Sequence, residues 1–550
     1  MKKMKLLMWS LFFFFLIALV GRFYLREGLP TTHDSVAHLL RFANYKMALR
    51  QGQFPPRLAP NLMNGYGYPA FNYNYPLANI LSLPFSVLNV HYETTFKILM
   101  LAALLLALAS AKSWLETLGY KKSVLIFALL ALALNPYLYA SVIFRGNIGE
   151  IMAVALLIAI LAQLAAIKQV KPDLLSWRTL FLTLTLMAFF LAHNIAAFFG
   201  SGLIIFYLLF DFAKNWKLWK IFLASFVLAF SASLWFWLPA LMEKSLVILD
   251  KVDLSINYYK HFPNISQLIS WPLSFGYSYW GNVDSMSLGI GLLQIAILIL
   301  SLVFVLQKNP TSNSMKVWFF VAALFIFGQL TWSRPFYDNL PFFSFIQFPW
   351  RLAMLLMVAL VPISALLFSR ARFGGRMLLF TILLVQLLQF YQVKPVDYHH
   401  RDRIDYEHDP STTTTNHENR PINFEYDYGK NREQFVEILD GTGSTAIERF
   451  FITHRKFNIN LDQDSRVVEA SVYFAGFETK VDGKKVDYID DEDVQGRLAY
   501  VLAKGEHQVE TRFTQNTPAR LIGNGVSLVS YFILLICFYL IYQKEKRDRA

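Results

Sequence analysis

Residues 32–76 read THDSVAHLLRFANYKMALRQGQFPPRLAPNLMNGYGYPAFNYNYP, and this stretch decides how the rest of the chain is interpreted. It lies between two hydrophobic segments, yet it is too polar and too rich in proline to be a membrane span itself. Long ordered loops are more often functional than mere spacers. We therefore expect an ordered loop at a membrane surface, with candidate functional side chains at His33, Asp34, His38, Arg41 and Arg57.

Apolar segments on both sides of this loop indicate a membrane protein. The chain has 550 residues, of which 55% are hydrophobic, and this is more apolar material than one soluble core needs. The first apolar run follows MKKMK without a small-residue cleavage site, so we interpret it as an uncleaved helix. Runs of about 20 apolar residues predict transmembrane helices. We expect about twelve, near 5–24, 94–116, 122–141, 148–167, 178–192, 194–212, 221–242, 287–306, 316–332, 351–369, 376–391 and 519–542.

The net charge of +13 would suggest a nucleic-acid partner in a soluble protein, but its distribution argues against one. Residues 391–520 hold 17 Lys/Arg and 24 Asp/Glu, whereas the basic excess lies in short loops between predicted helices. This pattern fits the positive-inside bias. We predict a multi-pass plasma-membrane protein with both termini cytoplasmic and residues 393–518 extracytoplasmic. The single cysteine, Cys537, excludes an internal disulfide and a thiolate metal cluster.

The composition changes after the eleventh predicted helix. Residues 397–421 are polar and low in apolar side chains, which is typical of a linker or a loosely ordered strap. Beyond them, residues 467–474 and 497–502 alternate with period two, and the dipeptides Asp482-Gly483 and Lys504-Gly505 punctuate the pattern. Turn dipeptides between alternating runs predict β-hairpins. We therefore expect a small antiparallel β-sandwich outside the membrane.

The expected fold is an α-helical polytopic membrane protein with a small extracytoplasmic β-sandwich near the C-terminus. Residues 76–90 are apolar but contain Pro76 and Pro84, which favours a re-entrant or interfacial helix. Residues 255–281 are rich in Tyr and Trp, so they could form an aromatic belt or line a lipid-substrate groove. The predicted parts are a transmembrane domain at 1–392 with an outer loop at 25–93, a polar linker at 393–420, a β-rich domain at 421–518, and a final helix with a basic cytoplasmic tail at 519–550.

Asp34 is the first candidate for chemistry, because it lies just beyond the first helix. Asp34 and His38 are four residues apart and share a face if the segment is helical. One interpretation makes Asp34 a general base at the membrane surface. The alternative makes it the N-cap of a helix over 35–50, a position that Asp favours. An Asp-x-x-x-His pair could also hold a divalent metal, but two ligands are too few to assert one.

Arginines at the predicted outer ends of helices are the second set of candidates. Arg145 and Glu150 frame the motif RGNIGE, and they could pair with each other, or Arg145 could grip a phosphate. Arg351 ends the motif QFPWR against the positive-inside trend, and it could snorkel to headgroups or bind phosphate. With Arg41 and Arg57, these arginines would suit an anionic, lipid-linked substrate.

A set of short motifs in this sequence resembles a known family. The motifs are HDSVAHL, GQFPPR, NGYGYP, YNYPL, RGNIGE and QFPWR, all within residues 1–390. They resemble bacterial multi-spanning membrane proteins called "6-pyruvoyl-tetrahydropterin synthase-related", whose architecture is similar to that of the GT-C superfamily of glycosyltransferases. The segments FAGFETKVDGKKV and KGEHQVE are similar to the C-terminal β-domains of related bacterial proteins, although Phe477 stands where those often have Trp.

The resemblance implies a GT-C-like fold and a sugar donor carried on polyprenyl phosphate. In that superfamily an acidic residue of the first outer loop serves as base or metal ligand, and Asp34 occupies that position without an adjacent carboxylate. The resemblance thus implies that Asp34 is catalytic. From their charge and position we predict that substrate is bound by His33, His38, Arg41, Arg57, Arg145, Glu150 and Arg351. A divalent metal is possible, but no metal ligands are assigned.

The function that follows is an integral-membrane glycosyltransferase acting on a cell-envelope glycan, lipid or protein acceptor. No GxxxxGK[ST], GxSxG, HExxH or GxGxxG motif is present, which argues against a cytosolic ATP-driven machine. Two alternatives remain: a non-enzymatic transporter or flippase for a lipid-linked sugar, and a membrane-anchored protein whose β-domain binds a surface polymer. Clear internal repeats, which carriers tend to show, are not evident.

Overall fold

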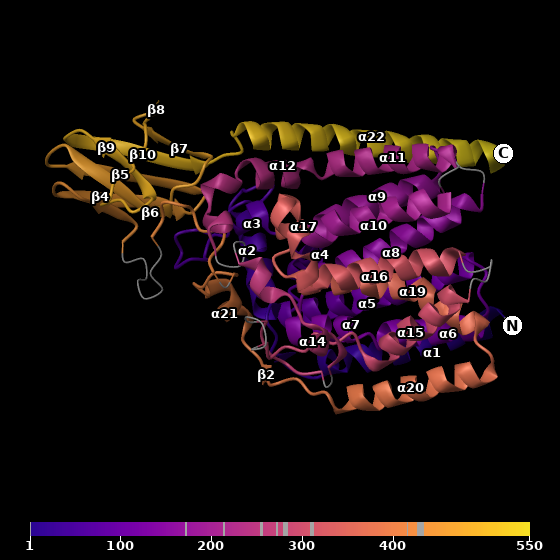
Figure 1. The fold of residues 1–550 in the computed structure, drawn as a ribbon. Coiled ribbons are helices and arrows are strands. Elements are labelled where there is room, and N and C mark those ends of the chain that lie inside the picture. The colour runs from indigo at the N-terminus through magenta and orange to yellow at the C-terminus, as the bar shows by residue number, and fades with distance from the viewer. Residues whose placement is uncertain are drawn as a thin grey trace.

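The structure is a computed structural model that describes residues 2–170, 173–212, 215–252, 257–270, 273–278, 284–307, 313–414, 416–425 and 434–549. Long helices run side by side in one bundle, and two β-sheets project from one end of it (Figure 1). Both chain termini lie at the opposite end of the bundle (Figure 1). Between the bundle and the sheets lie the short helices α2 and α3 (Figure 1).

Helices occupy each of the twelve ranges that the sequence predicts. Their bounds are α1 (Lys2–Gly21), α5 (Tyr92–Thr117), α6 (Lys122–Ala133), α7 (Pro136–Ala140), α8 (Ile148–Lys168), α9 (Trp177–Ala192), α10 (Asn194–Phe212), α11 (Trp216–Ala232), α12 (Leu234–Met242), α15 (Leu292–Leu306), α16 (Asn313–Gln329), α17 (Arg334–Asn339), α19 (Ala353–Arg370), α20 (Phe373–Gln392) and α22 (Pro518–Arg549). The shorter helices are α2 (Ser35–Arg50), α3 (Ala70–Tyr73), α4 (Leu77–Val87), α14 (Ile265–Ile269), α18 (Pro341–Ser344) and α21 (Arg403–His408).

The number of these helices that could cross a membrane is smaller than twelve. Among the described residues, six helices are long and apolar enough, or up to nine if each bent helix pair is one span. The three bent pairs are α6–α7, α11–α12, and α16 with the segment up to α17, with bends of 47°, 66° and 89°. Helices such as α9, with 16 residues, measure about 24 Å, less than the roughly 30 Å hydrocarbon core. The protein is therefore a polytopic membrane protein, and twelve spans stay a prediction.

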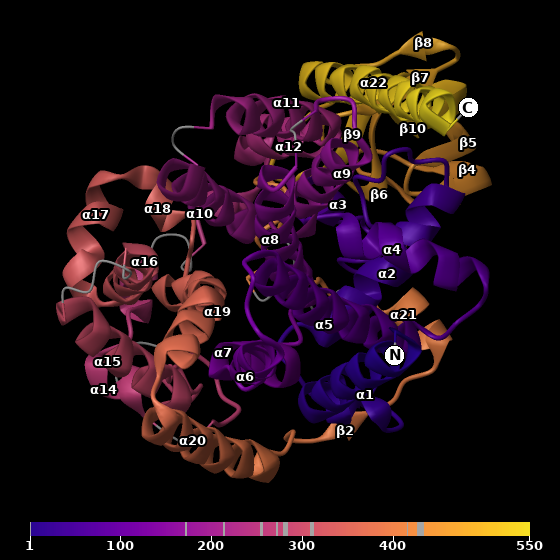
Figure 2. The same cartoon turned by 90° about the vertical axis from the view of Figure 1, so that its right-hand side faces the viewer.

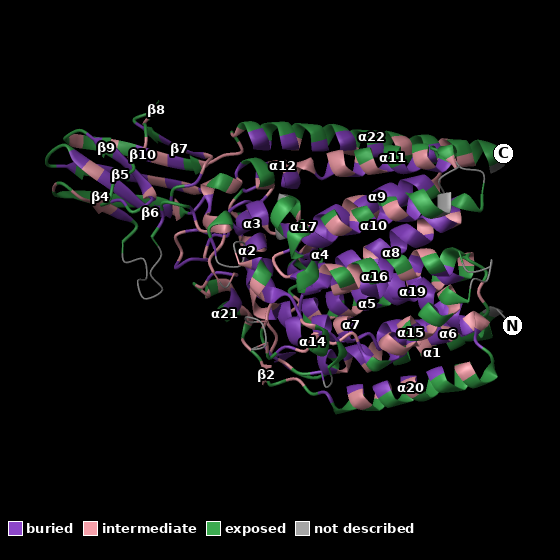
Figure 3. Ribbon diagram, viewed as in Figure 1, coloured by how far each residue is buried: buried purple, intermediate pink, exposed green. Residues whose placement is uncertain are grey.

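Burial separates inner helices from peripheral ones. The apolar segment of α8 is 89% buried, whereas those of α20 and α22 are each 22% buried. Viewed along the helices, α8 lies inside the bundle, and α20 and α22 lie at opposite edges (Figure 2). The outward faces of α20 and α22 are exposed along much of their length (Figure 3). Apolar side chains on such faces suit a lipid environment.

The bend between α6 and α7 is stabilised by two buried glutamines. Pro136 is the first residue of α7, and the interruption of the helix before it leaves backbone carbonyls without helical partners in an apolar environment. Gln294 donates to the carbonyls of Ala131 and Leu134, at 3.0 and 3.3 Å, and Gln386 donates to Leu134 at 2.5 Å. The bend leads α7 into a π-helical turn, η2 (Ser141–Arg145), and so positions Arg145.

The β-region consists of two antiparallel sheets that share a hydrophobic core, which includes Phe457, Val467, Leu498 and Val509. One sheet has the order β4-β5-β10-β7-β8 and the other the order β3-β6-β9. Their bounds are β3 (Val436–Ile438), β4 (Gly443–Phe451), β5 (His454–Leu461), β6 (Ser465–Val472), β7 (Phe477–Val481), β8 (Lys484–Lys485), β9 (Arg497–Leu502) and β10 (Gly505–Phe513).

The two predicted turn dipeptides behave differently. Asp482-Gly483 joins β7 to β8 with φ of 52° and 80°, as a tight hairpin requires, so that prediction is confirmed. Lys504-Gly505 lies between β9 and β10, which belong to different sheets, so the hairpin predicted there is wrong. Alternation in both flanking strands was consistent with a hairpin, but pairing depends on long-range packing that a local pattern does not encode.

Residues 394–414, here called the strap, run from α20 across the bundle end. Within the strap, β2 (Tyr398–His399) pairs with β1 (Leu29–Pro30), and Tyr406 of α21 is fully buried. Lys46 of α2 forms an ion pair with Glu407 at 3.2 Å. The polar segment that the sequence suggests as a linker is thus packed against α2 and α5. Of the aromatic stretch 255–281, residues 255–256, 271–272 and 279–281 lie outside the described part.

Candidate functional site

Two backbone hydrogen bonds hold the beginning of the outer loop against the turn after α7. The His33 N–H donates to the Phe144 carbonyl at 3.0 Å, and the Asp34 N–H donates to the Arg145 carbonyl at 2.9 Å. Gly146 follows with φ of +60°, and a Cβ there would lie 2.3 Å from the Thr32 hydroxyl oxygen. Only glycine meets both requirements. The motifs HDS and RGN, far apart in sequence, are therefore fixed side by side.

The helix that follows Asp34 is capped by a different residue. Asp34 is the residue before α2, but its side chain makes no capping hydrogen bond. The Ser35 N–H instead donates to the hydroxyl oxygen of Thr32 at 3.1 Å. The Asp34 carboxylate interacts electrostatically with Arg145, Arg351 and His33. The capping alternative therefore lacks its defining bond, and the Asp34 carboxylate interacts electrostatically with two arginines.

Arg145 and Glu150 form a buried two-pronged ion pair. The guanidinium nitrogens Nη1 and Nη2 lie 2.8 and 3.0 Å from the carboxylate oxygens Oε1 and Oε2. The side chains are 4% and 0% exposed, which means that neither charge is left to water. Tyr137 donates to Glu150 at 2.6 Å, and the Arg145 guanidinium lies 4.9 Å from the centre of the Trp350 ring. The mutual-pair alternative is thus present in the structure, whatever further role Arg145 has.

The remaining residues of RGNIGE also have structural roles. The Asn147 side chain accepts from the Glu150 N–H at 3.1 Å and so caps α8. The Tyr75 hydroxyl donates to the same Asn147 side chain at 3.3 Å. The Tyr75 ring packs over Gly149, where a Cβ would lie 2.1 Å from a ring carbon. The motif NYP of the outer loop therefore contacts RGNIGE directly.

Arg351 is less fully paired than Arg145. Its Nη1 donates to the Ile346 carbonyl and to the Gln347 side chain, both at 3.1 Å. Its Nε is buried and has no hydrogen-bond partner among the described residues. A cavity of about 30 Å³, whose lining includes Tyr137, Arg145 and Trp350, lies nearby. This volume suits water and is far below the roughly 300–1,000 Å³ of a pocket for a drug-sized ligand.

The two histidines of the loop are held in aromatic surroundings. His33 stacks on Tyr277 with ring centres 4.7 Å apart, and His38 is buried in α2. Burial lowers the pKa of His33, and burial together with Arg41 lowers the pKa of His38 well below its usual value. Both imidazoles are therefore neutral at pH 7. The Nε2 atoms of both are buried without a hydrogen-bond partner among the described residues.

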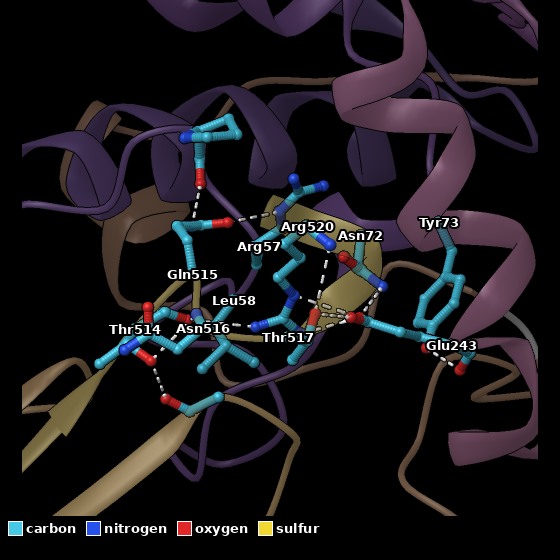
Figure 4. Close-up of polar contacts among 12 residues, drawn as sticks. Arg57, Leu58, Asn72, Tyr73, Glu243, Thr514, Gln515, Asn516, Thr517 and Arg520 are labelled. Carbon is cyan, nitrogen blue, oxygen red and sulfur yellow. Dashed lines mark hydrogen bonds and ion pairs between the residues drawn. The ribbon is translucent and has the colours of Figure 1, made fainter. Parts of the chain in front are cut away.

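The structure places the other two loop arginines apart from Asp34. Arg41 donates to the Thr413 carbonyl of the strap at 2.7 Å, and its Nε has no partner in the described part of the chain. Arg57 lies instead in a second buried cluster, the Glu243 cluster, made of Arg57, Asn72, Glu243, Thr517 and Arg520 (Figure 4). Its guanidinium donates to the Trp235 carbonyl at 2.7 Å and to Gln515 at 3.2 Å. Arg57 therefore ties the loop to the segment between β10 and α22.

The sequence missed several residues of the site. Thr32 caps α2, Tyr75 and Tyr137 contact the motif RGNIGE, and His193 lies 4.8 Å from Tyr75 between ring centres. The NYP motif carried a signal for Tyr75, but nothing local marked Tyr137. Asp34 and His38 gain no third ligand: the described residues that could hold a metal are His91, Glu93 and His400.

These features define a polytopic membrane protein with a polar site at the start of α2. No family model and no curated protein matches the chain. Among solved structures it is similar to the arabinofuranosyltransferase AftD from Mycobacteria, at 14% identity and a TM-score of 0.46, over 69% of this chain and 26% of that chain. It is also similar to the archaeal oligosaccharyltransferase AglB from Archaeoglobus fulgidus, solved with an inhibitory peptide and a dolichol-phosphate. That match has 13% identity and a TM-score of 0.36, over 69% of this chain and 55% of that chain.

The matched region thus spans about a quarter of the AftD chain. Both TM-scores lie below 0.5, so neither similarity decides the fold family or the activity of this protein.

Proposed function

We propose that this protein is a GT-C-type glycosyltransferase that uses a sugar on polyprenyl phosphate to modify a cell-envelope acceptor. The observation that carries the proposal is the Asp34 carboxylate, which makes no capping bond and interacts electrostatically with Arg145 and Arg351. Asp34 is also the only acidic residue between Gly28 and Val90. A carboxylate that makes no capping bond and interacts electrostatically with Arg351, whose Nε has no partner among the described residues, suits acid–base chemistry on an anionic substrate.

The proposed reaction is a direct displacement at the anomeric carbon of the donor. The acceptor oxygen forms a bond to that carbon as the bond from carbon to phosphate oxygen breaks. Asp34 takes the acceptor hydroxyl proton, and the phosphate leaves with the electron pair of the broken bond. Arg351 neutralises the charge that develops on the phosphate, and Arg145 adds to the local positive field while it stays paired with Glu150.

The other loop residues take supporting roles in this proposal. His33 and His38 are neutral, so they contribute hydrogen bonds to a sugar or phosphate and not charge. Arg41 links the base-bearing helix α2 to the strap through Thr413. Arg57 shapes the loop from the Glu243 cluster, away from the reacting atoms. A divalent metal at Asp34 is not required for the displacement as written.

The test is transfer of a labelled sugar from a polyprenyl-phosphate donor by purified protein in lipid. Asp34→Asn keeps the shape and removes the basicity, and loss of a general base costs roughly 10²–10⁴ in rate. Asp250→Asn is the matched control, because Asp250 is exposed and pairs only with Lys244 in the described structure. Transfer by Asp34→Asn within a few-fold of the parent would remove Asp34 from the mechanism. Donor flipping without transfer by the parent would favour the transporter alternative.

We further propose that the β-region and the strap are extracytoplasmic and that both termini are cytoplasmic. The placement of both termini at the bundle end away from the sheets supports this orientation (Figure 1). In a Cys537→Ala background, an impermeant thiol reagent should label Lys480→Cys in intact cells and should not label Lys316→Cys. Protection at position 480 with labelling after lysis would reverse the orientation.

A further inference from the structure

A second polar cluster lies where the strap meets the start of α5. His91 immediately precedes α5, Glu93 lies in its first turn, and His400 follows β2 in the strap. One ligand atom from each of these three side chains lies within 4.8 Å of the other two. The rings of His91 and His400 are 5.3 Å apart between centres. Residues separated by about 300 positions thus converge on one point.

The Glu93 carboxylate is oriented by partners outside this trio. Its Oε1 accepts from the Arg401 N–H at 3.0 Å and from the Tyr406 hydroxyl at 2.9 Å. These two donors leave Oε2 for His400, whose Nδ1 lies 2.9 Å away. The Glu93 side chain is 4% exposed. Ligating carboxylates in metal sites are held in this way by surrounding hydrogen bonds.

The two histidines supply nitrogen atoms that the fold does not fully use. The Nε2 of His91 is buried without a hydrogen-bond partner among the described residues, and its Nδ1 accepts a long 3.3 Å bond from the Glu93 N–H. An orphaned buried polar atom of this kind costs free energy unless something binds it. The side chain of His400 is 54% exposed, which gives an ion a path from solvent.

We propose that His91, Glu93 and His400 bind one divalent transition-metal ion, with zinc as the best fit. Two imidazole nitrogens and one carboxylate are a set that zinc takes with metal–ligand distances of about 2.0–2.2 Å. Ligand atoms around such an ion lie within about 4.2 Å of each other. The present 4.8 Å limit therefore closes by a small side-chain rotation. The ion would take the place of the 2.9 Å contact between His400 Nδ1 and Glu93 Oε2.

Charges around the cluster are mixed but do not oppose a cation. Glu27 and Asp402 interact electrostatically with His400, and Lys97 with Glu93. Arg401 forms an ion pair with Asp409 at 2.9 Å, which partly neutralises its charge. The start of α5 disfavours a cation through the helix dipole, and the Glu93 carboxylate in the first turn offsets this.

The metal would fasten the strap to α5. The same strap contacts α2 through the Lys46–Glu407 ion pair and the bond from Arg41 to Thr413. The ion would thus fix the strap beside the helix that begins at Asp34. This site is separate from Asp34, and it stands whether or not the protein transfers sugar.

The experiment uses the full-length protein in detergent, stripped with a chelator and then titrated with Zn²⁺. We expect one tight equivalent by calorimetry and by elemental analysis, together with a rise in the thermal unfolding temperature. His91→Asn removes the imidazole but keeps an N-cap, since Asn caps a helix well. His91→Asn and His400→Ala should each weaken binding by more than about 100-fold, and Tyr406→Phe by about 10–100-fold because it only orients Glu93.

His507→Ala is the matched control, because His507 and Asp482 form a histidine–carboxylate pair at 2.7 Å elsewhere on the surface. It should leave the tight equivalent unchanged. The proposal is overturned if the parent binds no stoichiometric zinc, if His91→Asn and His400→Ala both bind like the parent, or if His507→Ala loses the tight equivalent. Unfolding temperatures without zinc, compared across the variants, separate lost binding from lost folding.

Discussion

The Arg145–Glu150 pair and the Glu243 cluster both bury guanidinium and carboxylate groups, yet they are built differently. In the first, one arginine meets one carboxylate through two bonds of 2.8 and 3.0 Å. In the second, Glu243 accepts from Arg520 at 2.8 Å, from Asn72 at 3.0 Å and from Thr517 at 2.6 Å, and Arg57 lies in the same cluster (Figure 4). One carboxylate there forms an ion pair with Arg520 and acts on Arg57 only electrostatically.

This difference separates the proposed substrate site from a structural joint between the outer loop and α22. Both carboxylate oxygens of Glu243 accept hydrogen bonds, and Arg57 and Arg520 also donate to the carbonyls of Trp235 and Thr514. Arg57 Nη1 and Asn72 Oδ1 are buried without a partner among the described residues. Burial, with Arg520 nearby, lowers the pKa of Arg57, which shows the cost of the crowding. The balanced pair at Arg145 leaves the neighbouring Asp34 and Arg351 available. We propose different uses for these two buried clusters: substrate binding beside the Arg145–Glu150 pair, and attachment of the loop to α22 at Glu243.

Breaking the joint should have the largest effect on stability. Glu243→Gln leaves Arg57 and Arg520 buried without a counter-charge, and breaking a buried pair typically costs about 3–5 kcal/mol. We expect a large fall in the thermal unfolding temperature, with sugar transfer per folded molecule unchanged. Glu116→Gln is the control, because its pair with Lys112 is half-exposed. If Glu243→Gln has the same thermal unfolding temperature as the parent protein, the cluster does not join the loop to α22.

Arg351 and Arg145 should respond differently to truncation. Arg351→Ala removes a charged donor with a free nitrogen, a loss of about 1.5–3 kcal/mol, which raises the KM for the lipid donor by roughly 10–100-fold. Arg351→Lys should restore this only in part, because Lys lacks the planar fork. Arg145→Ala should act mainly on stability, since it strands the buried Glu150.

The control for these kinetics is Arg334→Ala, at an exposed arginine paired with Asp338. If the KM of Arg351→Ala for the lipid donor equals that of the parent protein, Arg351 does not bind the phosphate. A stable Arg145→Ala protein with an altered donor KM would show that Arg145 also binds the phosphate.

Apolar runs and basic loops predicted where the helices lie, because burial in lipid leaves a strong local pattern. The alternation at 467–474 likewise indicated β6. What could not be predicted depends on contacts between distant segments. The bends at α6–α7 rely on Gln294 and Gln386, and the Lys504-Gly505 link crosses between sheets.

The site shows the same limit at the level of single residues. The sequence identified Asp34, Arg145 and Arg351 as candidates, because charged residues at the membrane ends of helices are rare in an apolar sequence. The structure places Arg57 in the Glu243 cluster, because sequence proximity to Asp34 does not determine which way a loop folds back. Thr32, an ordinary polar residue, gave no signal of its own as the cap.

The smallest predicted effect concerns that cap. Thr32→Val keeps the shape beside Gly146 and removes the hydroxyl oxygen that accepts from Ser35. Loss of an N-cap costs about 0.5–2 kcal/mol, so the unfolding temperature should fall modestly while Asp34→Asn leaves it unchanged. For sugar transfer we expect the opposite order: Thr32→Val should be close to the parent protein, and Asp34→Asn should lose most of its activity. Asp34→Ala tests the capping role, because Asn caps a helix about as well as Asp and Ala does not. If Asp34→Ala lowers the unfolding temperature as much as Thr32→Val does, Asp34 serves as the cap after all. The carboxylate would then be consumed by the fold, and the contrast with the Glu243 cluster would disappear.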